Sequence, residues 1–588
     1  MKKIFLYLFI VSSLFSGCRP KGALVSGFTE LSDPDSLQYA TTWGNCSAGL
    51  NAAFGSTDIR YARTVMPENG LSASWAATGW KGERIYTQVV LWSSEDVISV
   101  KVSAGNLTDD RGNKIDTPAV VLSPVGYVIT DAFLNGCSHR DKDTIASHLA
   151  ADILHHNRTF NIPGRTARPV WVSVNIPVDA PAGKYTGNIF ITALNDSTSL
   201  TYNITVQGLM LPPPSDWSFH LDLWQNPFAI ARFHKVPLWS EEHWQLIRKY
   251  LVLLADAGQK CITTSIIDHP WHGQTYDPFG SMITWLHSSS GEWDYDYAIF
   301  DQYIETAMDA GITAQINCYT MVPGGNRFSW FEEDSSGYIT RVLQPGSQEY
   351  EDLWRPFLWD FREHLREREW LDKTTIAMDE RNHKQMAAQL AFLKETAPEF
   401  KVTLAGHYYP DLMPAVHDFS FNWRLIDQAN SEMLAKRRNN GKKTTFYVAC
   451  GIPYPNTFTF SPPSEATFPG WVAAAYGFDG FLRWAYNSWP ETPLTDSRFI
   501  TWPAGDTYLI YPGPLSSIRF EKLREGIQDY EKIRILEEIM KSSENTDQLK
   551  QFKKLKDLLE NIRGNPESAA EQKRIEEGKK LINLLTGF

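Results

Sequence analysis

The chain has 588 residues, of which 43% are hydrophobic and 21% are charged, and its formal net charge is −12. This length exceeds what a single hydrophobic core usually organises, so the sequence predicts two or three domains. The acidic balance and the lack of a long basic run argue against a nucleic-acid partner.

Aromatic residues are frequent, with 21 Trp, 24 Tyr and 31 Phe. Many of these rings must fill hydrophobic cores. The number of tryptophans also suits a protein that stacks rings against the apolar faces of a polar ligand, as sugars require.

The amino-terminal stretch MKKIFLYLFIVSSLFSGC has the pattern of a signal peptide. A short basic start precedes an apolar run from Ile4 to Phe15, which is too short for a permanent membrane span. Its Ser-Gly-Cys ending resembles a bacterial lipoprotein signal, so we expect residues 1–18 to be a lipoprotein signal peptide and Cys18 to be lipidated. Because Phe15 departs from the usual residue at its position, ordinary secretion is the alternative. The predicted location is the bacterial cell envelope, periplasmic or at the cell surface, with membrane attachment through the lipid only.

The remaining cysteines are odd in number, scattered, and without a Cys-x-x-Cys pair; they are Cys46, Cys137, Cys261, Cys318 and Cys450. This pattern favours buried thiols over a disulfide framework or a zinc site.

Residues 24–210 read as β-structure. Segments such as RIYTQVVLW, VISVKVSA and PVWVSVNIPV alternate or are rich in β-branched residues, with turn clusters such as DDRGNK between them. The sequence predicts an antiparallel β-sandwich. Pro212–Pro214 then form a stiff linker.

Residues 216–515 change to a strand–helix rhythm, which predicts a (β/α)₈ barrel of the TIM type. The eight expected strands are 219–225, 261–267, 312–319, 374–380, 401–407, 419–423, 444–450 and 481–486. Charge-rich helices with an apolar face are expected over 516–588 as a carboxy-terminal helical region.

The adjacent carboxylates Asp379 and Glu380 end the fourth expected strand, in TTIAMDE. Catalytic residues of such barrels lie at the carboxy-terminal ends of strands, where further polar and aromatic side chains are expected to bind substrate. These candidates are Asp222, Trp224, Asn317, Tyr319, His407, Trp423, Tyr447, Trp484 and Tyr486. We expect about half of such rim residues to touch ligand. No phosphate-binding glycine loop, Gly-x-Ser-x-Gly or HExxH motif occurs, so no cofactor or metal is expected.

Adjacent carboxylates suit one form of glycoside hydrolysis. In the ordinary retaining mechanism, an acid and a nucleophile flank the sugar about 5–5.5 Å apart, usually on different strands. Sequence neighbours fit better if a 2-acetamido group of the sugar attacks its own anomeric carbon. One carboxylate then holds the amide N–H and balances the oxazolinium charge, and the other is the acid and then the base. An ionised carboxylate beside the acid should raise the pKa of that acid, which predicts a bell-shaped pH profile peaking on the mildly acidic side of neutral.

The strand itself poses a difficulty, since Asp379 and Glu380 point to opposite faces of a regular strand. Both can face one sugar only if the backbone leaves the pleat near residue 379. The sequence therefore predicts such a break.

Taken together, the signal, the sandwich, the barrel with MDE at a strand end, and the block DGFLRWAYNSWP…AGDTYLIYPGP…SIRFEKLREGIQDYEKI resemble glycoside hydrolase family 123. The most specific part holds Gly480, Trp484, Asp506, Tyr511, Pro512 and Gly513 in order. The resemblance implies a retaining exo-β-N-acetylgalactosaminidase that works by acetamide participation without a metal. It implies that Glu380 is the acid/base and that Asp379 orients the acetamide. The implied partner is an oligosaccharide or glycolipid with terminal β-GalNAc.

Other readings stay open at this point. One is a β-N-acetylglucosaminidase, or another retaining glycosidase that has its nucleophile on a different strand, at Asp222 or Asp268. Another is a non-catalytic glycan-binding lipoprotein. The sandwich is expected to be a structural support.

Overall fold

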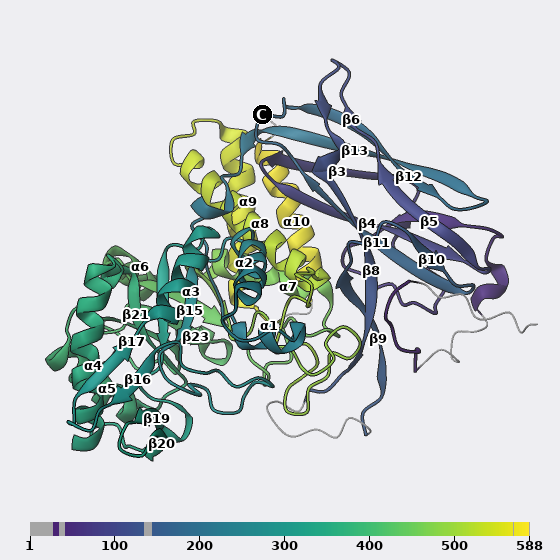
Figure 1. The fold of residues 1–588 in the computed structure, drawn as a ribbon. Helices are drawn as coiled ribbons and strands as arrows, with labels where there is room; N and C mark the ends of the chain where they lie inside the picture. The colour runs from purple at the N-terminus through teal and green to yellow at the C-terminus, as the bar shows by residue number, and fades with distance from the viewer. Residues whose placement is uncertain (1–26, 35–41, 135–143, 568–569, 587–588) are drawn as a thin grey trace, which may run out of the picture.

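A computed structural model describes residues 27–34, 42–134, 144–567 and 570–586 (Figure 1). The predicted signal peptide and Cys18 lie outside these residues. Within the described part of the chain, no helix is long and apolar enough to cross a membrane.

The amino-terminal domain consists of two packed sheets, at the upper right of Figure 1. The six-stranded sheet contains, in spatial order, β2 (Leu71–Ser72), β1 (Asn51–Gly55), β4 (Arg84–Ser93), β11 (Thr166–Asn175), β8 (Val120–Asp131) and β9 (Ser147–Leu154). The second sheet contains β10 (Phe160–Ile162), β5 (Val97–Ala104), β12 (Gly183–Thr192), β13 (Ser197–Met210) and β3 (Trp75–Lys81), with β6 (Leu107–Thr108) and β7 (Lys114–Ile115) beside them. Pairing is antiparallel except between β13 and β3.

Burial along the strands shows which faces are covered. Strand β12 alternates buried and more exposed residues, because its outer face meets solvent. Strand β4 is buried on both faces: Val89 packs in the core between the sheets, whereas Tyr86 packs with Trp171 and with Ile518 of a carboxy-terminal helix. The six-stranded sheet is therefore the inner layer, facing the rest of the molecule.

Eight parallel strands form the barrel. They are β14 (His220–Leu223), β15 (Cys261–Ser265), β18 (Gln315–Tyr319), β21 (Thr374–Asp379), β22 (Lys401–Gly406), β23 (Asp418–Asn422), β24 (Lys443–Tyr447) and β25 (Gly480–Arg483). All eight strands expected from the sequence are present. Strands β14 and β15 meet through the isolated bridge between Leu221 and Gln259, which nearly closes the ring. The predicted fold, an amino-terminal sandwich followed by a (β/α)₈ barrel, is confirmed.

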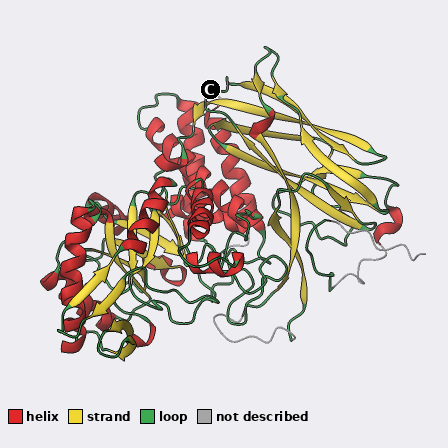
Figure 2. Ribbon diagram, viewed as in Figure 1, coloured by secondary structure: helices red, strands yellow, loops and turns green. Residues whose placement is uncertain are grey.

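Helices surround the barrel (Figure 2). They are α1 (Pro227–His234), α2 (Glu241–Ala255), α3 (Ala298–Asp309), α4 (Gln348–Glu367), α5 (His383–Thr396), α6 (Ser431–Asn439) and α7 (Pro463–Tyr476). Short 3₁₀ segments occur at η1 (Thr42–Asn45), η2 (Thr117–Ala119), η3 (Pro214–Asp216), η4 (Gly324–Asn326), η5 (Leu371–Lys373) and η6 (Trp423–Gln428).

A small four-stranded sheet is inserted in the loops that follow β15 and β18. It consists of β16 (Thr284–His287), β17 (Trp293–Asp296), β19 (Arg327–Glu332) and β20 (Gly337–Val342). Trp285 stacks on Phe357 of α4 with ring centroids 4.2 Å apart, which seats the sheet on the barrel. These strands were not predicted from the sequence.

The carboxy-terminal helices are α8 (Ile518–Met540), α9 (Thr546–Gly564) and α10 (Glu571–Thr586), and they stand between the sandwich and the barrel (Figure 1). The Ser517 side chain caps α8 by accepting a hydrogen bond from the Phe520 N–H. A Cβ atom on Gly470 of α7 would lie 1.9 Å from the Gly526 carbonyl oxygen of α8, so these helices can cross closely only with glycine there.

Candidate active site

The predicted break in the pleat occurs at Glu380. Strand β21 ends at Asp379, and Glu380 has a φ of 48°, in the left-handed region. The Glu380 N–H donates to the carbonyl oxygen of Ala405 at 2.8 Å, which holds this conformation. The side chains of Asp379 and Glu380 consequently line the same pocket.

Neighbouring elements hold this turn in place. Gly406, at the end of β22, has a φ of 148°, and a Cβ atom there would lie 3.2 Å from the Glu380 Cα. On the other side, Asn382 begins α5 with a capping box that includes Gln385. The acidic pair is thus fixed between a strand end and a helix start.

The pocket has a volume of about 360 Å³ and opens at the carboxy-terminal ends of the barrel strands. Its lining comes from strand ends and from the loops that follow them. The lining residues are Trp224, Gln274, Asp379, Glu380, Ala405, Asn422, Arg424, Tyr447, Ala449, Cys450, Gly451, Ile452, Leu482, Trp484 and Trp502.

Glu380 is held by a short hydrogen-bond chain. The Tyr447 hydroxyl donates to Glu380 Oε1 at 2.6 Å and accepts from Asn422 Nδ2 at 3.0 Å. Burial, and then the charge of Glu380, raise the pKa of Tyr447 far above its ordinary value. Tyr447 is therefore a protonated donor throughout the neutral range, and it orients the Glu380 carboxylate.

Asp379 has a different environment. Burial, followed by the charge of Glu380, raises its pKa from 3.8 to about 7, and Arg381 opposes this shift. Within the described residues, no hydrogen bond reaches its carboxylate, which leaves both oxygens available to a ligand. The sequence did not predict this shift for Asp379, which follows from the burial of its carboxyl group in the folded chain.

Tryptophans form one wall of the pocket. The Trp484 indole N–H donates to Asp506 Oδ2 at 3.2 Å, and that of Trp502 donates to the Gln274 carbonyl oxygen at 2.7 Å. The two tryptophan rings meet edge to face with centroids 5.5 Å apart. Such rings offer apolar faces to a sugar.

Of the nine predicted substrate-binding residues, Trp224, Tyr447 and Trp484 line the pocket with the acidic pair. The structure places the other six outside it. Tyr319 packs beneath Trp224 with ring centroids 4.7 Å apart. Asn317 Nδ2 donates to Asp222 Oδ2 at 3.0 Å. Burial, followed by the charge of Asp418, raises the pKa of Asp222 to about 7.

The remaining three predicted residues have other surroundings. The Tyr486 hydroxyl donates to the Tyr250 carbonyl oxygen in the core. Trp423 is buried against Phe446, because it begins η6 after the strand end. His407 is exposed and does not line the pocket.

Several lining residues were missed, notably Gln274, Arg424 and Trp502. Gln274 and Trp502 lie in long loops without a motif, and tertiary folding brings them to the rim. Asn422 stands at a predicted strand end, where polar rim residues were expected, and it does line the pocket.

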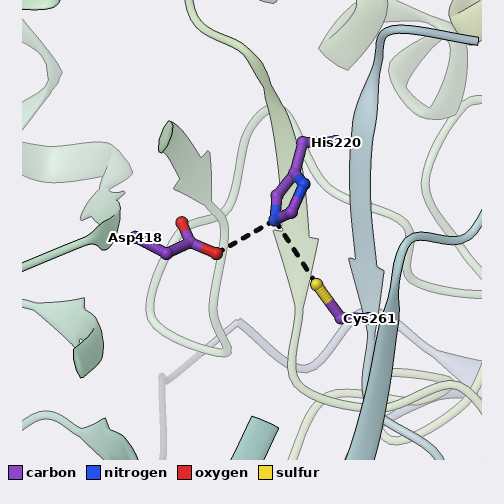
Figure 3. A group of neighbouring side chains, drawn as sticks. All are labelled: His220, Cys261 and Asp418. Carbon is purple, nitrogen blue, oxygen red and sulfur yellow. Dashed lines mark hydrogen bonds and ion pairs between the residues drawn. The ribbon is translucent and has the colours of Figure 1, made fainter. Parts of the chain in front are cut away.

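A buried group at the other end of the barrel, drawn in Figure 3, consists of His220, Cys261 and Asp418. His220 Nε2 lies 2.9 Å from Asp418 Oδ2 and 3.4 Å from Cys261 Sγ, and Gln315 Nε2 donates to the same Asp418 oxygen at 2.8 Å. Burial raises the pKa of the Cys261 thiol well above its ordinary value, so the sulfur keeps its proton. These donors and acceptors satisfy one another, and we assign the group to the barrel core.

One cysteine differs from the sequence prediction. Cys46, Cys261 and Cys318 are free, as expected, but Cys450 is disulfide-bonded. Spacing along the sequence does not show which cysteines the fold brings together, so the prediction of buried thiols was wrong for this residue.

Comparisons with known proteins give a consistent result for both large domains. The family model "Glycoside hydrolase 123, catalytic domain" matches residues 224–536, and the model "Glycoside hydrolase 123 N-terminal domain" matches residues 54–193. A family 123 glycoside hydrolase from Clostridium perfringens, described in a study of glycolipid glycan hydrolysis, is 27% identical, with a TM-score of 0.82. That alignment covers 91% of this chain and 98% of the other.

More distant structures include β-glucuronidase 3 from Bacteroides uniformis, with 9% identity, a TM-score of 0.31, and coverage of 77% of this chain and 51% of the other. A search of curated proteins finds no match to the chain.

Proposed function

Because the chain belongs to glycoside hydrolase family 123, we propose that it is an exo-acting, retaining β-N-acetylgalactosaminidase that works by substrate-assisted catalysis. Family membership establishes a glycosidase of this family. The sugar that it recognises and the nucleophile that it uses are the proposal.

One observation carries the mechanism: the acidic residues of the pocket are sequence neighbours. Among the described residues that line it, Asp379 and Glu380 are the only carboxylates. An enzyme nucleophile would have to approach the anomeric carbon from the face opposite the acid, usually from another strand. The pocket lining offers no carboxylate there, whereas a 2-acetamido group would bring its own nucleophile.

The proposed reaction assigns a role to each group. Glu380 donates its proton to the glycosidic oxygen as the bond to the anomeric carbon breaks, and the acetamide carbonyl oxygen forms a bond to that carbon. Asp379 accepts the amide N–H and balances the positive charge of the oxazolinium. Glu380 then takes a proton from a water molecule as the water oxygen forms a bond to the anomeric carbon. The bond from that carbon to the acetamide oxygen breaks, which opens the oxazolinium ring and gives the sugar with retained configuration. Tyr447 keeps the Glu380 carboxylate oriented in both steps.

The proposed substrate is a glycan that ends in β-linked GalNAc, on a glycolipid or a similar carrier. The Clostridium perfringens relative is described with glycolipid glycan hydrolysis, and it aligns over 91% of this chain. A small pocket at the end of the barrel suits a terminal sugar. We further propose that the lipid anchor predicted at Cys18 holds the enzyme in the bacterial cell envelope.

The test is turnover of chromogenic β-GalNAc, β-GlcNAc and β-Gal substrates under identical conditions. We expect β-GalNAc to be hydrolysed fastest and β-Gal, which lacks the acetamide, to be inert. Faster β-GlcNAc turnover would reassign the enzyme as a β-N-acetylglucosaminidase. Hydrolysis of β-Gal would contradict the substrate-supplied nucleophile, and no turnover of any substrate would favour a glycan-binding protein.

A further inference from the structure

We infer that Asp152, on strand β9 of the amino-terminal sandwich, is a positioning residue for the tryptophan wall of the active site. The inference rests on the proposed function for its kinetic test. It gives the sandwich a part in shaping the pocket, beyond that of a support.

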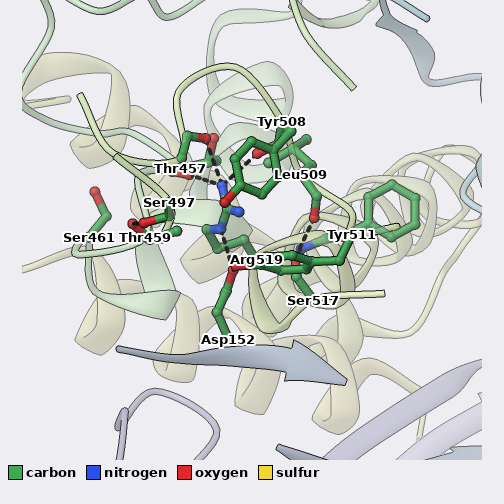
Figure 4. Close-up of polar contacts among 12 residues, drawn as sticks. Asp152, Thr457, Thr459, Ser461, Ser497, Tyr508, Leu509, Tyr511, Ser517 and Arg519 are labelled. Carbon is green, nitrogen blue, oxygen red and sulfur yellow. Dashed lines mark hydrogen bonds and ion pairs between the residues drawn. The ribbon is translucent and has the colours of Figure 1, made fainter. Parts of the chain in front are cut away.

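Asp152 belongs to a buried polar cluster that joins the sandwich to the barrel loops and has Arg519 at its centre (Figure 4). Asp152 Oδ2 accepts hydrogen bonds from Arg519 Nε at 2.9 Å and from the Tyr511 hydroxyl at 2.7 Å. Its Oδ1 accepts one from Arg60 Nη1 at 3.0 Å. Burial opposes ionisation, but the charges of Arg519 and Arg60 hold the pKa of Asp152 below its ordinary value. The carboxylate therefore binds two cations, one through each of its oxygens.

Arg519 transmits this interaction to the active-site loops. Its Nη1 donates to the carbonyl oxygens of Thr457, Gly505 and Tyr508, at 2.8, 2.9 and 2.8 Å respectively. The guanidinium thus fixes two segments that are far apart in sequence. Asp152 orients this guanidinium, since it binds the Nε of the same planar group.

The fixed segment 505–508 leads directly to Trp484. Asp506 lies within it and accepts the Trp484 indole N–H at 3.2 Å and Arg483 Nη2 at 2.8 Å. Both Arg483 and Asp506 are fully buried, and their ion pair fixes the Asp506 carboxylate. This carboxylate is the acceptor that holds the Trp484 indole N–H. Trp484 in turn contacts Trp502, and both rings line the pocket.

A second set of contacts joins the sandwich to the loop that carries Trp502. The Ile129 N–H, on β8, donates to the Thr495 carbonyl oxygen, and the Ser497 N–H donates back to the Ile129 carbonyl oxygen, each at 2.9 Å. The hydroxyls of Thr130, Thr459 and Ser497 form a buried chain with successive distances of 2.7 and 2.8 Å. Strand β8 thus extends its pairing to the loop before Trp502.

A matched control is Glu83 of the sandwich, which pairs with Lys532 of the same helix, α8. Glu83 accepts from Lys532 Nζ at 2.6 Å and from the Trp80 N–H at 2.7 Å. Like the Asp152–Arg519 pair, this is a buried pair between a sandwich carboxylate and a cation of α8. The other contact of Lys532 is with Asp529 of the same helix, and not with the loops that line the pocket.

The experiment compares Asp152→Asn with Glu83→Gln. Each amide keeps the shape but turns one NH₂ donor toward another donor. For Asp152→Asn, we expect KM for the chromogenic β-GalNAc substrate to rise about tenfold, with kcat within about twofold and the pH profile unchanged. Glu83→Gln should lower the melting temperature and leave KM unchanged. The milder Thr130→Val, which removes one hydroxyl contact, should raise KM about threefold.

A substrate-independent readout accompanies the kinetics. In protein labelled with 5-fluorotryptophan, Asp152→Asn should shift or broaden the ¹⁹F signals of Trp484 and Trp502, assigned by Trp→Phe variants, and Glu83→Gln should not. The inference is overturned if folded Asp152→Asn or Thr130→Val keeps wild-type KM and wild-type signals, or if Glu83→Gln changes them equally. An inactive wild type would instead contradict the proposed function, and the ¹⁹F signals would still decide the inference.

Discussion

At the scale of single residues, Asp379 and Glu380 differ in what surrounds each carboxylate. Glu380 accepts a hydrogen bond from Tyr447, whereas burial raises the pKa of Asp379 to about 7. The pair therefore holds one proton under mildly acidic conditions. Loss of that proton should produce the alkaline limb of the activity profile near neutral pH, and an optimum above pH 8 would contradict this assignment.

The same shift predicts a stability effect. The folded-state pKa of Asp379 lies above its ordinary value of 3.8, so the folded state binds this proton more tightly than the unfolded state. Its stabilising contribution is complete below about pH 4 and is lost as pH rises through about 7. Asp379→Asn should therefore melt about 1–2 °C above wild type at pH 8 and equal to it at pH 4. Differential scanning calorimetry at both pH values measures this; a lower melting temperature at pH 8 would contradict it.

Substitution of the two acids should also lower kcat/KM in different ways. Glu380→Gln removes proton donation, worth about 10²–10⁴-fold, and the loss should be much smaller for a good phenolic leaving group. Asp379→Asn cannot balance the oxazolinium charge, so it should slow both substrate types by about 10²-fold. The measurement is kcat/KM for a nitrophenyl and an alkyl glycoside in each variant. Equal leaving-group sensitivity in the two variants would contradict the division of roles.

At the scale of secondary-structure elements, the contact between β21 and β22 positions the acid. A methyl group on Gly406 would lie 3.2 Å from the Glu380 Cα and would displace that backbone. Gly406→Ala should therefore lower kcat by about 100-fold, as misplacement of about 1 Å can do. Gly441→Ala is the matched control, because Gly441 also has a positive φ, of 69°, but has no atom within 4 Å of a Cβ. Equal kcat in the two variants would show that this contact does not position Glu380.

The barrel strands could be predicted because short runs such as residues 374–378 are buried on both faces and begin or end at helical segments. The break at Glu380 followed from a functional requirement, since regular pleating would separate the two acids. The inserted strands β16, β17, β19 and β20 were missed because their short, aromatic segments interrupt a region that was assigned to loops. A turn such as SSSG, residues 288–291, was the available signal for the β16–β17 hairpin.

Residues whose role depends on distant segments could not be predicted. Trp502 reaches the pocket because its loop pairs with β8 and contacts Gln274. Asp222 and Asn317 were correctly placed on barrel strands. Their side chains bond to each other and do not line the pocket. Depth within a barrel depends on strand tilt and stagger, which sequence position alone does not give.

At the scale of the whole molecule, the sandwich and the barrel share one hydrophobic core. Trp80, Val128 and Ile153 of the sandwich belong to the same buried cluster as the barrel and α8 residues. We therefore expect a single cooperative thermal transition, with equal calorimetric and van't Hoff enthalpies, for residues 27–588. Residues 212–588 alone should be aggregation-prone, since their removal from the sandwich exposes this core. Two separate transitions in calorimetry would show that the domains are energetically independent.

The central claim is that the substrate's acetamide is the nucleophile and that Asp379 stabilises the cyclised intermediate. A GalNAc-thiazoline is a stable mimic of that intermediate, and its inhibition constant in wild type and in Asp379→Asn is the most direct measurement. We expect the wild type to bind it at least about 100-fold more tightly than free GalNAc, and Asp379→Asn to lose most of that difference. If the thiazoline binds wild type no better than GalNAc, or binds both proteins equally, catalysis by this pair through an oxazolinium is contradicted.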